Sequence, residues 1–403
     1  MLLSFDSDFT RHVGEYLALV LLAAVGMMFL VGAEDLLMIF VSLELTSLSL
    51  YVLTAFNQRN VKSAEAALKY FLFGGMSAAF LLFGLSLIYG LSGATNLRPV
   101  AVALAGQGLD PLLVVALVLV VIGFGFKVAA VPFHLWAPDA YQGAPTPSAA
   151  FIASGSKVAS FFIFAKVMML GFAGTEGSAA FHAYAPGWVP VLAIVAGLSM
   201  VLGNLAAIVQ SSVKRLLAYS AIAHAGYMLV AVLSHDPQAV ASLIYYAVTY
   251  GLTTIGAFGV VLVVENLAGD DQLASFAGLS RRAPGVALCM MVFMLSLAGI
   301  PPLAGFFGKF YVFAAAIKSG APHLGLLWLV ILAIAMSAVS LFYYLQVLKQ
   351  IYLANPPAGS PVVAVPLMTQ ITLAVLALGV LLLGCFPGVL VGVIEHAMMS
   401  LGH

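Results

Sequence analysis

Several titratable side chains interrupt long apolar stretches of this sequence. Burial in an apolar environment disfavours the charged form of a lysine, whereas a nearby carboxylate favours it. Moving or weakening that carboxylate changes how tightly the lysine holds its proton, so a row of such groups can load and release protons in sequence. The residue types and their spacing predict a proton relay made of Glu44, Lys127, Lys157, His224 and Lys309, with Lys69 as a weaker candidate.

Two of these lysines stand beside prolines in their own apolar stretch. Pro132 follows Lys127 after five residues, and Pro301 and Pro302 precede Lys309. The simplest alternative is a lysine that extends its ammonium group to the membrane surface. The coincidence of a charge with a helix break favours a functional site instead, because a charge inside a bilayer is costly.

The other candidate residues can also be explained without a role in proton transfer. Glu44 could remain a neutral, hydrogen-bonded acid, and a membrane histidine such as His224 is often only an interhelical hydrogen bond. Lys69 follows Glu65 by four residues, the favoured order for an ordinary helical ion pair. We expect Glu44 to pair with Lys127, since an ion pair offsets part of the desolvation cost of both groups.

Composition places these residues in a membrane protein. Of the 403 residues, 63% are hydrophobic and only 7% are charged, whereas soluble domains carry about 25% charged residues. The formal net charge is zero, so nothing indicates a nucleic acid partner. Cys289 and Cys385 lie far apart in apolar stretches, and they predict neither a zinc nor an iron–sulfur site.

Apolar stretches long enough to span a bilayer predict an all-α, polytopic membrane protein with about eleven transmembrane helices. The stretch 283–318 is longer than one span needs and contains two prolines, so it should be broken or kinked. The predicted helices cover residues 14–32, 35–56, 62–90, 110–131, 148–172, 187–209, 214–234, 238–265, 283–318, 323–353 and 365–387.

The distribution of basic residues predicts the orientation in the membrane. With the N-terminus inside, eight basic residues fall in cytoplasmic segments and two on the opposite side, in agreement with the positive-inside rule. This orientation puts the segment 1–13 and the polar connection 132–147 in the cytoplasm and the C-terminus in the periplasm. The eight residues are Arg11, Arg59, Lys62, Lys214, Arg215, Arg281, Arg282 and Lys349, and the two are Arg98 and Lys318.

The spacing of the candidates also predicts an internal repeat. Lys127 and Lys309 are 182 residues and five predicted helices apart, and the same offset carries Glu44 to position 226, two residues from His224. Because five is odd, the second set of helices must be inverted relative to the first, an arrangement typical of ion transporters. The predicted divisions are a five-helix unit at 14–172, an inverted five-helix unit at 187–353, each with a broken fourth helix, and a final helix at 365–387.

The sequence resembles the antiporter-like membrane subunits of respiratory complex I, which are related to the multisubunit sodium/proton antiporters. The resemblance covers nearly the whole chain. Within the family, AYQGAPTP and SAEAALKYF resemble one of these subunits more than its sister subunits, which more often have a histidine near position 141. The matching stretches are LELTSLSLY (43–51), SAEAALKYFLFG (63–74), GFGFKVAAVPFHLWAPDAYQGAPTP (123–147), SVKRLLAYSAIAHAGYM (212–228) and GIPPLAGFFGKFYVF (299–313).

The resemblance implies a role for each matching residue. Glu44 matches the family's glutamate that pairs with the lysine of the first broken helix, and Lys127 matches that lysine. Lys157 matches the central connecting lysine, and His224 matches a residue of the central polar axis. Lys309 matches the lysine of the second broken helix, which is expected to face the outer half-channel.

The resemblance also implies a function and partners. It predicts a proton-translocating membrane-arm subunit of NADH-quinone oxidoreductase in the inner membrane of a bacterium, next to other membrane subunits. Such a subunit belongs to a translocase without a redox site of its own, since NADH, FMN, iron–sulfur clusters and quinone bind to partner subunits. No metal or cofactor is expected in this chain. Typical bacterial members have fourteen helices, and this chain begins at what would be their fourth.

Three alternatives remain open at this point. The chain could be a subunit of a multisubunit sodium/proton antiporter, or the membrane arm of a hydrogenase-linked or ferredoxin-linked relative. It could also be a structural spacer whose lysines no longer move protons. The sequence does not choose between H+ and Na+, nor does it assign a role to His134 and Asp139 in the connection 132–147.

Overall fold

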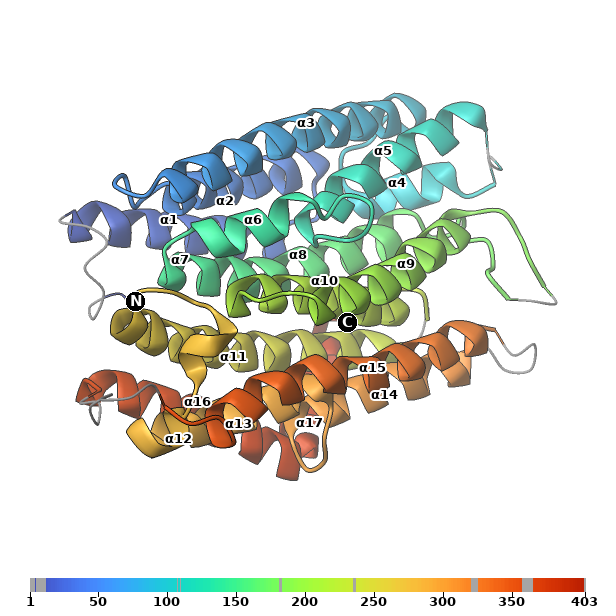
Figure 1. The fold of residues 1–403 in the computed structure, drawn as a ribbon. Helices are drawn as coiled ribbons and strands as arrows, with labels where there is room; N and C mark the ends of the chain where they lie inside the picture. Colours follow the sequence, from blue (N-terminus) through green and yellow to red (C-terminus); the bar gives the residue numbers. More distant parts are fainter. Residues whose placement is uncertain are drawn as a thin grey trace.

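The computed structural model describes residues 4, 12–106, 108, 110–180, 183–234, 237–319, 325–356 and 365–401. Within these residues every element of regular structure is helical, and the helices form an elongated bundle (Figure 1). Most of the predicted cytoplasmic segment 1–13, including Arg11, lies outside the described residues. The same is true of residues 323 and 324, at the start of one predicted helix.

The first half of the bundle, coloured blue to green in Figure 1, contains five predicted spans and two short helices between them. The span that starts at Thr146 continues through two π-helical turns to Gly171. The elements are α1 (Val13–Gly32), α2 (Leu36–Thr54), α3 (Val61–Ser92), α4 (Leu97–Leu104), α5 (Pro111–Lys127), α6 (Trp136–Gly143), α7 (Thr146–Phe151), a π turn (Ile152–Ser156), α8 (Lys157–Lys166) and a second π turn (Val167–Gly171).

The second half contains the remaining predicted spans. The stretch 283–318 is split into α13 and α14, as its prolines predicted, and α17 follows the last predicted helix. The elements are α9 (Trp188–Ile208), α10 (Val213–Val232), α11 (Pro237–Ala268), a 3₁₀ turn (Leu273–Phe276), α12 (Leu279–Arg282), α13 (Pro284–Ala298), α14 (Ala304–Ser319), α15 (Leu327–Tyr352), α16 (Leu367–Cys385) and α17 (Pro387–Leu401).

The number of spans agrees with the predicted architecture. Nine helices in the described residues are long and apolar enough to cross a membrane. α5 and the pair α13–α14 are shorter because each is interrupted, and they supply the remaining crossings of the predicted eleven. The prediction of an all-α polytopic membrane protein is therefore confirmed. α17 was not predicted; Pro387 begins it at the first helical position, which proline favours.

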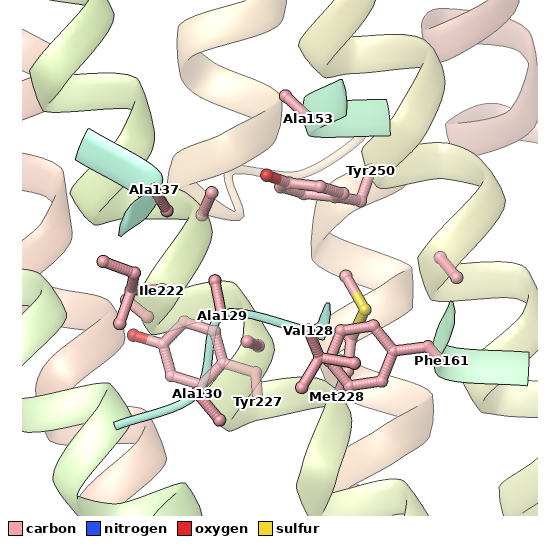
Figure 2. Packing of buried hydrophobic residues seen from close by; sticks show 14 of the residues in the cluster. Val128, Ala129, Ala130, Ala137, Ala153, Phe161, Ile222, Tyr227, Met228 and Tyr250 are labelled. Carbon is pink, nitrogen blue, oxygen red and sulfur yellow. The ribbon is translucent and has the colours of Figure 1, made fainter. Parts of the chain in front are cut away.

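The break after α5 lies in the centre of the bundle. α5 ends at Lys127, four residues before the predicted end, and the turn that follows is fully buried. Figure 2 shows Val128, Ala129 and Ala130 of this turn among side chains of α10. The backbone N–H of Ala130 donates to the Gly125 carbonyl oxygen at 2.8 Å, and that of Val131 donates to Ser199 Oγ at 2.9 Å. Irregular backbone at membrane depth is stable only when such partners replace the helical ones.

The connection predicted at 132–147 differs from the expected polar loop. Residues 136–143 form α6, and Trp136 and Tyr141 are buried. The indole N–H of Trp136 donates to the Phe126 carbonyl oxygen at 2.9 Å, and its ring stacks on Tyr70 of α3 with centroids 4.2 Å apart. The connection is therefore a packed helical segment held against the end of α5 and against α3.

α10 lies in the middle of the bundle, between the two broken helices. Its residues are almost all buried, and it contacts α6, α9, α11, α14 and α15. A small residue permits the close approach of α9, since a Cβ atom on Gly203 would lie only 2.6 Å from the Ala223 nitrogen. Close packing at small residues is a main source of stability between helices in a membrane. α10 is therefore positioned to connect groups from both halves.

Candidate functional site

Lys127 ends α5 at the edge of the buried break, and its side chain is 8% exposed. Its Nζ atom donates a hydrogen bond to Ser47 Oγ on α2. The ammonium group also lies 5.7 Å from the ring centroid of Tyr51 and 5.5 Å from that of Phe126. These aromatic faces offer the cation a weak additional attraction. A buried lysine with one hydroxyl acceptor is suited to exchange its proton.

Glu44 lies one turn before Ser47 on α2, close enough to Lys127 to interact with it electrostatically. The expected ion pair is not present in the structure: Ser47, one turn later on α2, accepts a hydrogen bond from Lys127, whereas Glu44 accepts none from it. Among the described residues, the Oε1 atom of Glu44 is buried and has no hydrogen-bond partner. The structure therefore brings the predicted pair near each other without direct contact.

Lys157 is the first residue of α8, directly after the π turn Ile152–Ser156. A π turn inserts one extra residue into a helix and is often found at functional sites. The Nζ atom donates to the backbone carbonyl oxygen of Ala221 on α10, and the ammonium lies 5.9 Å from the ring centroid of Tyr250. Lys157 is thus bonded across the interface between the first half of the chain and α10.

His224 lies one turn after Ala221 on α10, and both of its ring nitrogens have phenol partners. Nδ1 is 2.7 Å from the hydroxyl of Tyr246 on α11, and Nε2 is 3.1 Å from the hydroxyl of Tyr344 on α15. The Tyr344 hydroxyl also contacts Ser220 Oγ. An imidazole bonded on both sides can accept a proton at one nitrogen and release one from the other.

Lys309 on α14 donates to three acceptors, two at the second break and one on α15. They are the carbonyl oxygens of Leu297 at 3.0 Å and Ala298 at 3.1 Å, and the hydroxyl oxygen of Ser337 at 2.8 Å. The two carbonyls belong to the last turn of α13, where helical carbonyl groups have no intrahelical partner and carry partial negative charge. The break therefore supplies two of the acceptors for this ammonium group, and Ser337 of α15 supplies the third.

One face of α10 contacts both buried lysines, Lys157 and Lys309, and carries His224 between them. Ala221, His224 and Tyr227 are three residues apart, so they share one face of the helix. Ala221 accepts from Lys157, and the Tyr227 ring lies 5.0 Å from the Lys309 ammonium. His224 stands between them and is close enough to both lysines for electrostatic interaction. The structure thus brings Lys157, His224 and Lys309 together along one helix face.

Lys69 does not join this buried group. Its ammonium is 2.8 Å from Glu65, the ion pair expected from the sequence, and 2.8 Å from Asp139 on α6. Its side chain is 43% exposed. Asp139 also accepts from Arg215 at 2.6 Å. Burial, the largest single influence, would raise the pKa of Asp139, but the hydrogen bonds and charges of Lys69 and Arg215 together hold it below its ordinary value.

His134 precedes α6 and has a lowered pKa, because burial disfavours the charged imidazole more than the contact with the Pro132 backbone favours it. Its Nδ1 atom is buried without a hydrogen-bond partner in the described part of the chain. His134 therefore lies in the packed connection between α5 and α6. The structure does not bring it together with the buried lysines.

An additional ion pair, between a buried lysine and a part-buried glutamate, lies near α6 and was not predicted from the sequence. Lys214 Nζ is 2.7 Å from Glu265 and 3.0 Å from Thr146 Oγ1. The two charged groups line a polar pocket of about 400 Å³ together with Asn57, Asn60, Thr146 and Asp271. The sequence does contain a signal for this pair. Lys214 lies at the N-terminus of α10, where the helix dipole disfavours a positive charge, so a nearby acidic partner could be expected.

The described residues contain no group of three or more histidine, cysteine, aspartate or glutamate side chains placed to hold a metal ion. Cys289 and Cys385 are both free thiols. The titratable groups that the structure assembles are lysines, a histidine and tyrosines bonded to neutral oxygens. This arrangement can hold and transfer protons.

Comparison with known proteins agrees with this chemistry. The family described as NADH:quinone oxidoreductase/Mrp antiporter, TM matches residues 33–343. NADH-quinone oxidoreductase subunit N 2 from Acidobacterium capsulatum is 59% identical over 95% of this chain and 77% of its own length.

Solved structures have the same fold. A chain in respiratory complex I from Thermus thermophilus with bound aureothin has a TM-score of 0.78 and 39% identity, covering 94% of this chain and 79% of that chain. A chain in the archaeal membrane-bound sulfane sulfur reductase has a TM-score of 0.86 and 27% identity, covering 98% and 78%. The protein belongs to the family of membrane subunits that NADH:quinone oxidoreductases and Mrp antiporters share.

Proposed function

We propose that this chain is subunit N of a proton-translocating NADH-quinone oxidoreductase in the inner membrane of a bacterium. The high identity to a protein of that name over most of both chains supports this assignment. In this role the chain binds no cofactor, and NADH, FMN, iron–sulfur clusters and quinone belong to partner subunits. The chain lies beside other membrane subunits and moves protons in response to quinone reduction elsewhere in the complex.

The observation that carries the proposal is the buried row along α10. Lys157 donates to Ala221, His224 is bonded by two phenols, and Lys309 lies over Tyr227. These acceptors are neutral, so each lysine is free to lose its proton without leaving a carboxylate unpaired. Lys127 and Glu44 supply the first step, and the row passes protons from α8 towards α14.

Two further features belong to this proposal. The chain is divided into units at 14–172 and 187–353, the second inverted, followed by a final transmembrane helix at 365–387. The similar packing of α1, α2, α3 and α5 in one unit and of α9, α10, α11 and α14 in the other supports the division. The N-terminus lies in the cytoplasm, and the C-terminus lies in the periplasm.

A proton-pumping measurement on the purified complex tests the proposal. Lys127→Ala should abolish or strongly reduce proton uptake into vesicles and coupled NADH oxidation, while the complex still assembles. Lys349→Ala is the control, because Lys349 is an exposed lysine near the end of α15. An unchanged ratio of protons to electrons in Lys127→Ala would show that this chain does not carry protons in the proposed way.

The antiporter alternative rests on the family itself, whose description includes Mrp antiporters. Purification distinguishes it from the proposed function: flavin and iron–sulfur proteins should copurify with this chain in an oxidoreductase. Copurification with other antiporter subunits alone would support the alternative. A hydrogenase-linked or ferredoxin-linked arm would copurify with iron–sulfur proteins but would not oxidise NADH.

A further inference from the structure

Ser47 accepts the hydrogen bond that Glu44 was expected to accept from Lys127. Its side chain is completely buried between α2 and the end of α5. Its own hydroxyl proton points to the Leu43 carbonyl oxygen, one turn earlier on α2. A hydroxyl has one proton to donate and lone pairs that accept, and both functions are in use here.

The carboxylate of Glu44 is close by but does not contact the ammonium group. Its Oε1 atom has no hydrogen-bond partner among the described residues, although the group interacts electrostatically with Lys127. An ammonium has three N–H donors and bonds more strongly to a carboxylate than to a neutral hydroxyl. The structure therefore holds Lys127 on the weaker of two nearby acceptors.

We propose that Ser47 is a positioning residue that keeps the ammonium of Lys127 on a neutral acceptor and so limits its attraction to Glu44. The inference rests on the proposed function, in which Lys127 must release its proton in every cycle. When the N–H bond breaks and the proton passes to the next acceptor, a neutral amine remains. The Ser47 hydroxyl can then turn from Leu43 and donate to that amine, so both states of the lysine have a partner.

The surroundings of Lys127 offer few competing groups. On α2, Tyr51 presents its ring to the ammonium, and on α3 the ring of Tyr70 lies edge-on to Tyr51 with centroids 4.6 Å apart. On α8, Lys157 is bonded to Ala221 of α10 instead. The hydroxyl of Tyr51 is also buried without a hydrogen-bond partner among the described residues, but it is neutral. Glu44 is consequently the stronger acceptor, to which the ammonium should move when the hydroxyl of Ser47 is removed.

The test compares two buried serines of α2 in the purified complex. Ser47→Ala should lower the rate of coupled proton pumping about tenfold, because the lysine then pairs with the carboxylate. Its rate profile should also move to higher pH by about one unit, because a paired ammonium gives up its proton less readily. Ser49→Ala is the matched control: Ser49 is also buried and bonds to the carbonyl of Leu45, at 2.8 Å, but contacts no lysine. Ser47→Thr, which keeps the hydroxyl, should restore the rate.

A double variant separates positioning from simple damage to the helix. In the Glu44→Gln background the carboxylate is neutral, so removing the hydroxyl of Ser47 should change the rate and the pH profile much less. Equal effects of Ser47→Ala in both backgrounds, or equal rates for Ser47→Ala and Ser49→Ala, would overturn the inference while leaving the proposed function intact. Full pumping in Lys127→Ala would overturn both.

Discussion

The ammonium group of Lys214 lies 2.7 Å from a carboxylate oxygen of Glu265, and its side chain is only 6% exposed. The pair ties the start of α10 to the end of α11, and Thr146 adds a contact from α7. Lys214 lies at the N-terminus of α10, where the helix dipole disfavours a positive charge, and Glu265 lies near the C-terminus of α11, where it disfavours a negative charge. Each therefore depends on the other.

Neutralising one member of this pair should destabilise the complex. Glu265→Gln leaves a buried ammonium without a charged partner, and we expect a loss of about 3 kcal/mol in unfolding free energy, since Thr146 still accepts from Lys214. Thermal unfolding of the purified complex measures the change. Glu395→Gln, at an exposed carboxylate of α17, serves as the control and should leave the midpoint temperature unchanged.

The acceptors of Lys309 predict a graded response at the second break. Lys309→Met should abolish proton pumping, whereas Lys318→Met, at an exposed lysine of the same helix, should not affect it. Ser337→Ala should reduce pumping only about two- to threefold, because the carbonyls of Leu297 and Ala298 remain as acceptors. A loss in Ser337→Ala as large as that in Lys309→Met would contradict this account.

The two phenols on His224 predict a functional difference between neighbouring tyrosines. Tyr344→Phe removes the partner of Nε2 and should slow pumping about tenfold, because a buried nitrogen loses its hydrogen bond. Tyr343→Phe removes a bond to Asn204 Oδ1 instead, at 2.9 Å. It should lower thermal stability without a comparable loss of pumping. Measuring both quantities for both variants distinguishes the relay from ordinary packing.

The lowered pKa of Asp139 predicts how the contribution of this residue to stability depends on pH. A carboxyl whose folded-state pKa is depressed stabilises the protein fully above its unfolded pKa, and this contribution is lost as pH falls through the folded pKa. Asp139→Asn should therefore lower the unfolding temperature at pH 7. The difference from the unaltered protein should shrink steadily as the pH is lowered below about 4. A constant difference at all pH values would mean that the charge of Asp139 does not contribute.

Local signals in the sequence were sufficient to predict the two helix breaks and to identify the buried lysines beside them. A lysine in an apolar stretch beside prolines is unusual on its own, so Lys127 and Lys309 could be identified without a structure. The helix α17 was missed because Pro387, which begins it, was taken as the end of the preceding apolar stretch.

The partners of these lysines could not be predicted in the same way. Ser47 and Lys127 are 80 residues apart, and His224 and Tyr344 are 120 apart. Which residue of a helix meets a distant lysine depends on the rotation of that helix about its axis, and Glu44 and Ser47 differ by only one turn. Spacing selects the correct face of α2, but packing against α5 selects the acceptor.

Asp139 accepts one hydrogen bond from Lys69 of α3 and one from Arg215 of α10. α3 and α10 belong to opposite halves of the chain, and α6 carries the carboxylate between them. A displacement of α6 that breaks one of these bonds also alters the other. α6 is therefore a shared support of the two halves: Asp139 and Gln142 bond to Arg215 of α10, while Asp139 and Trp136 contact Lys69 and Tyr70 of α3.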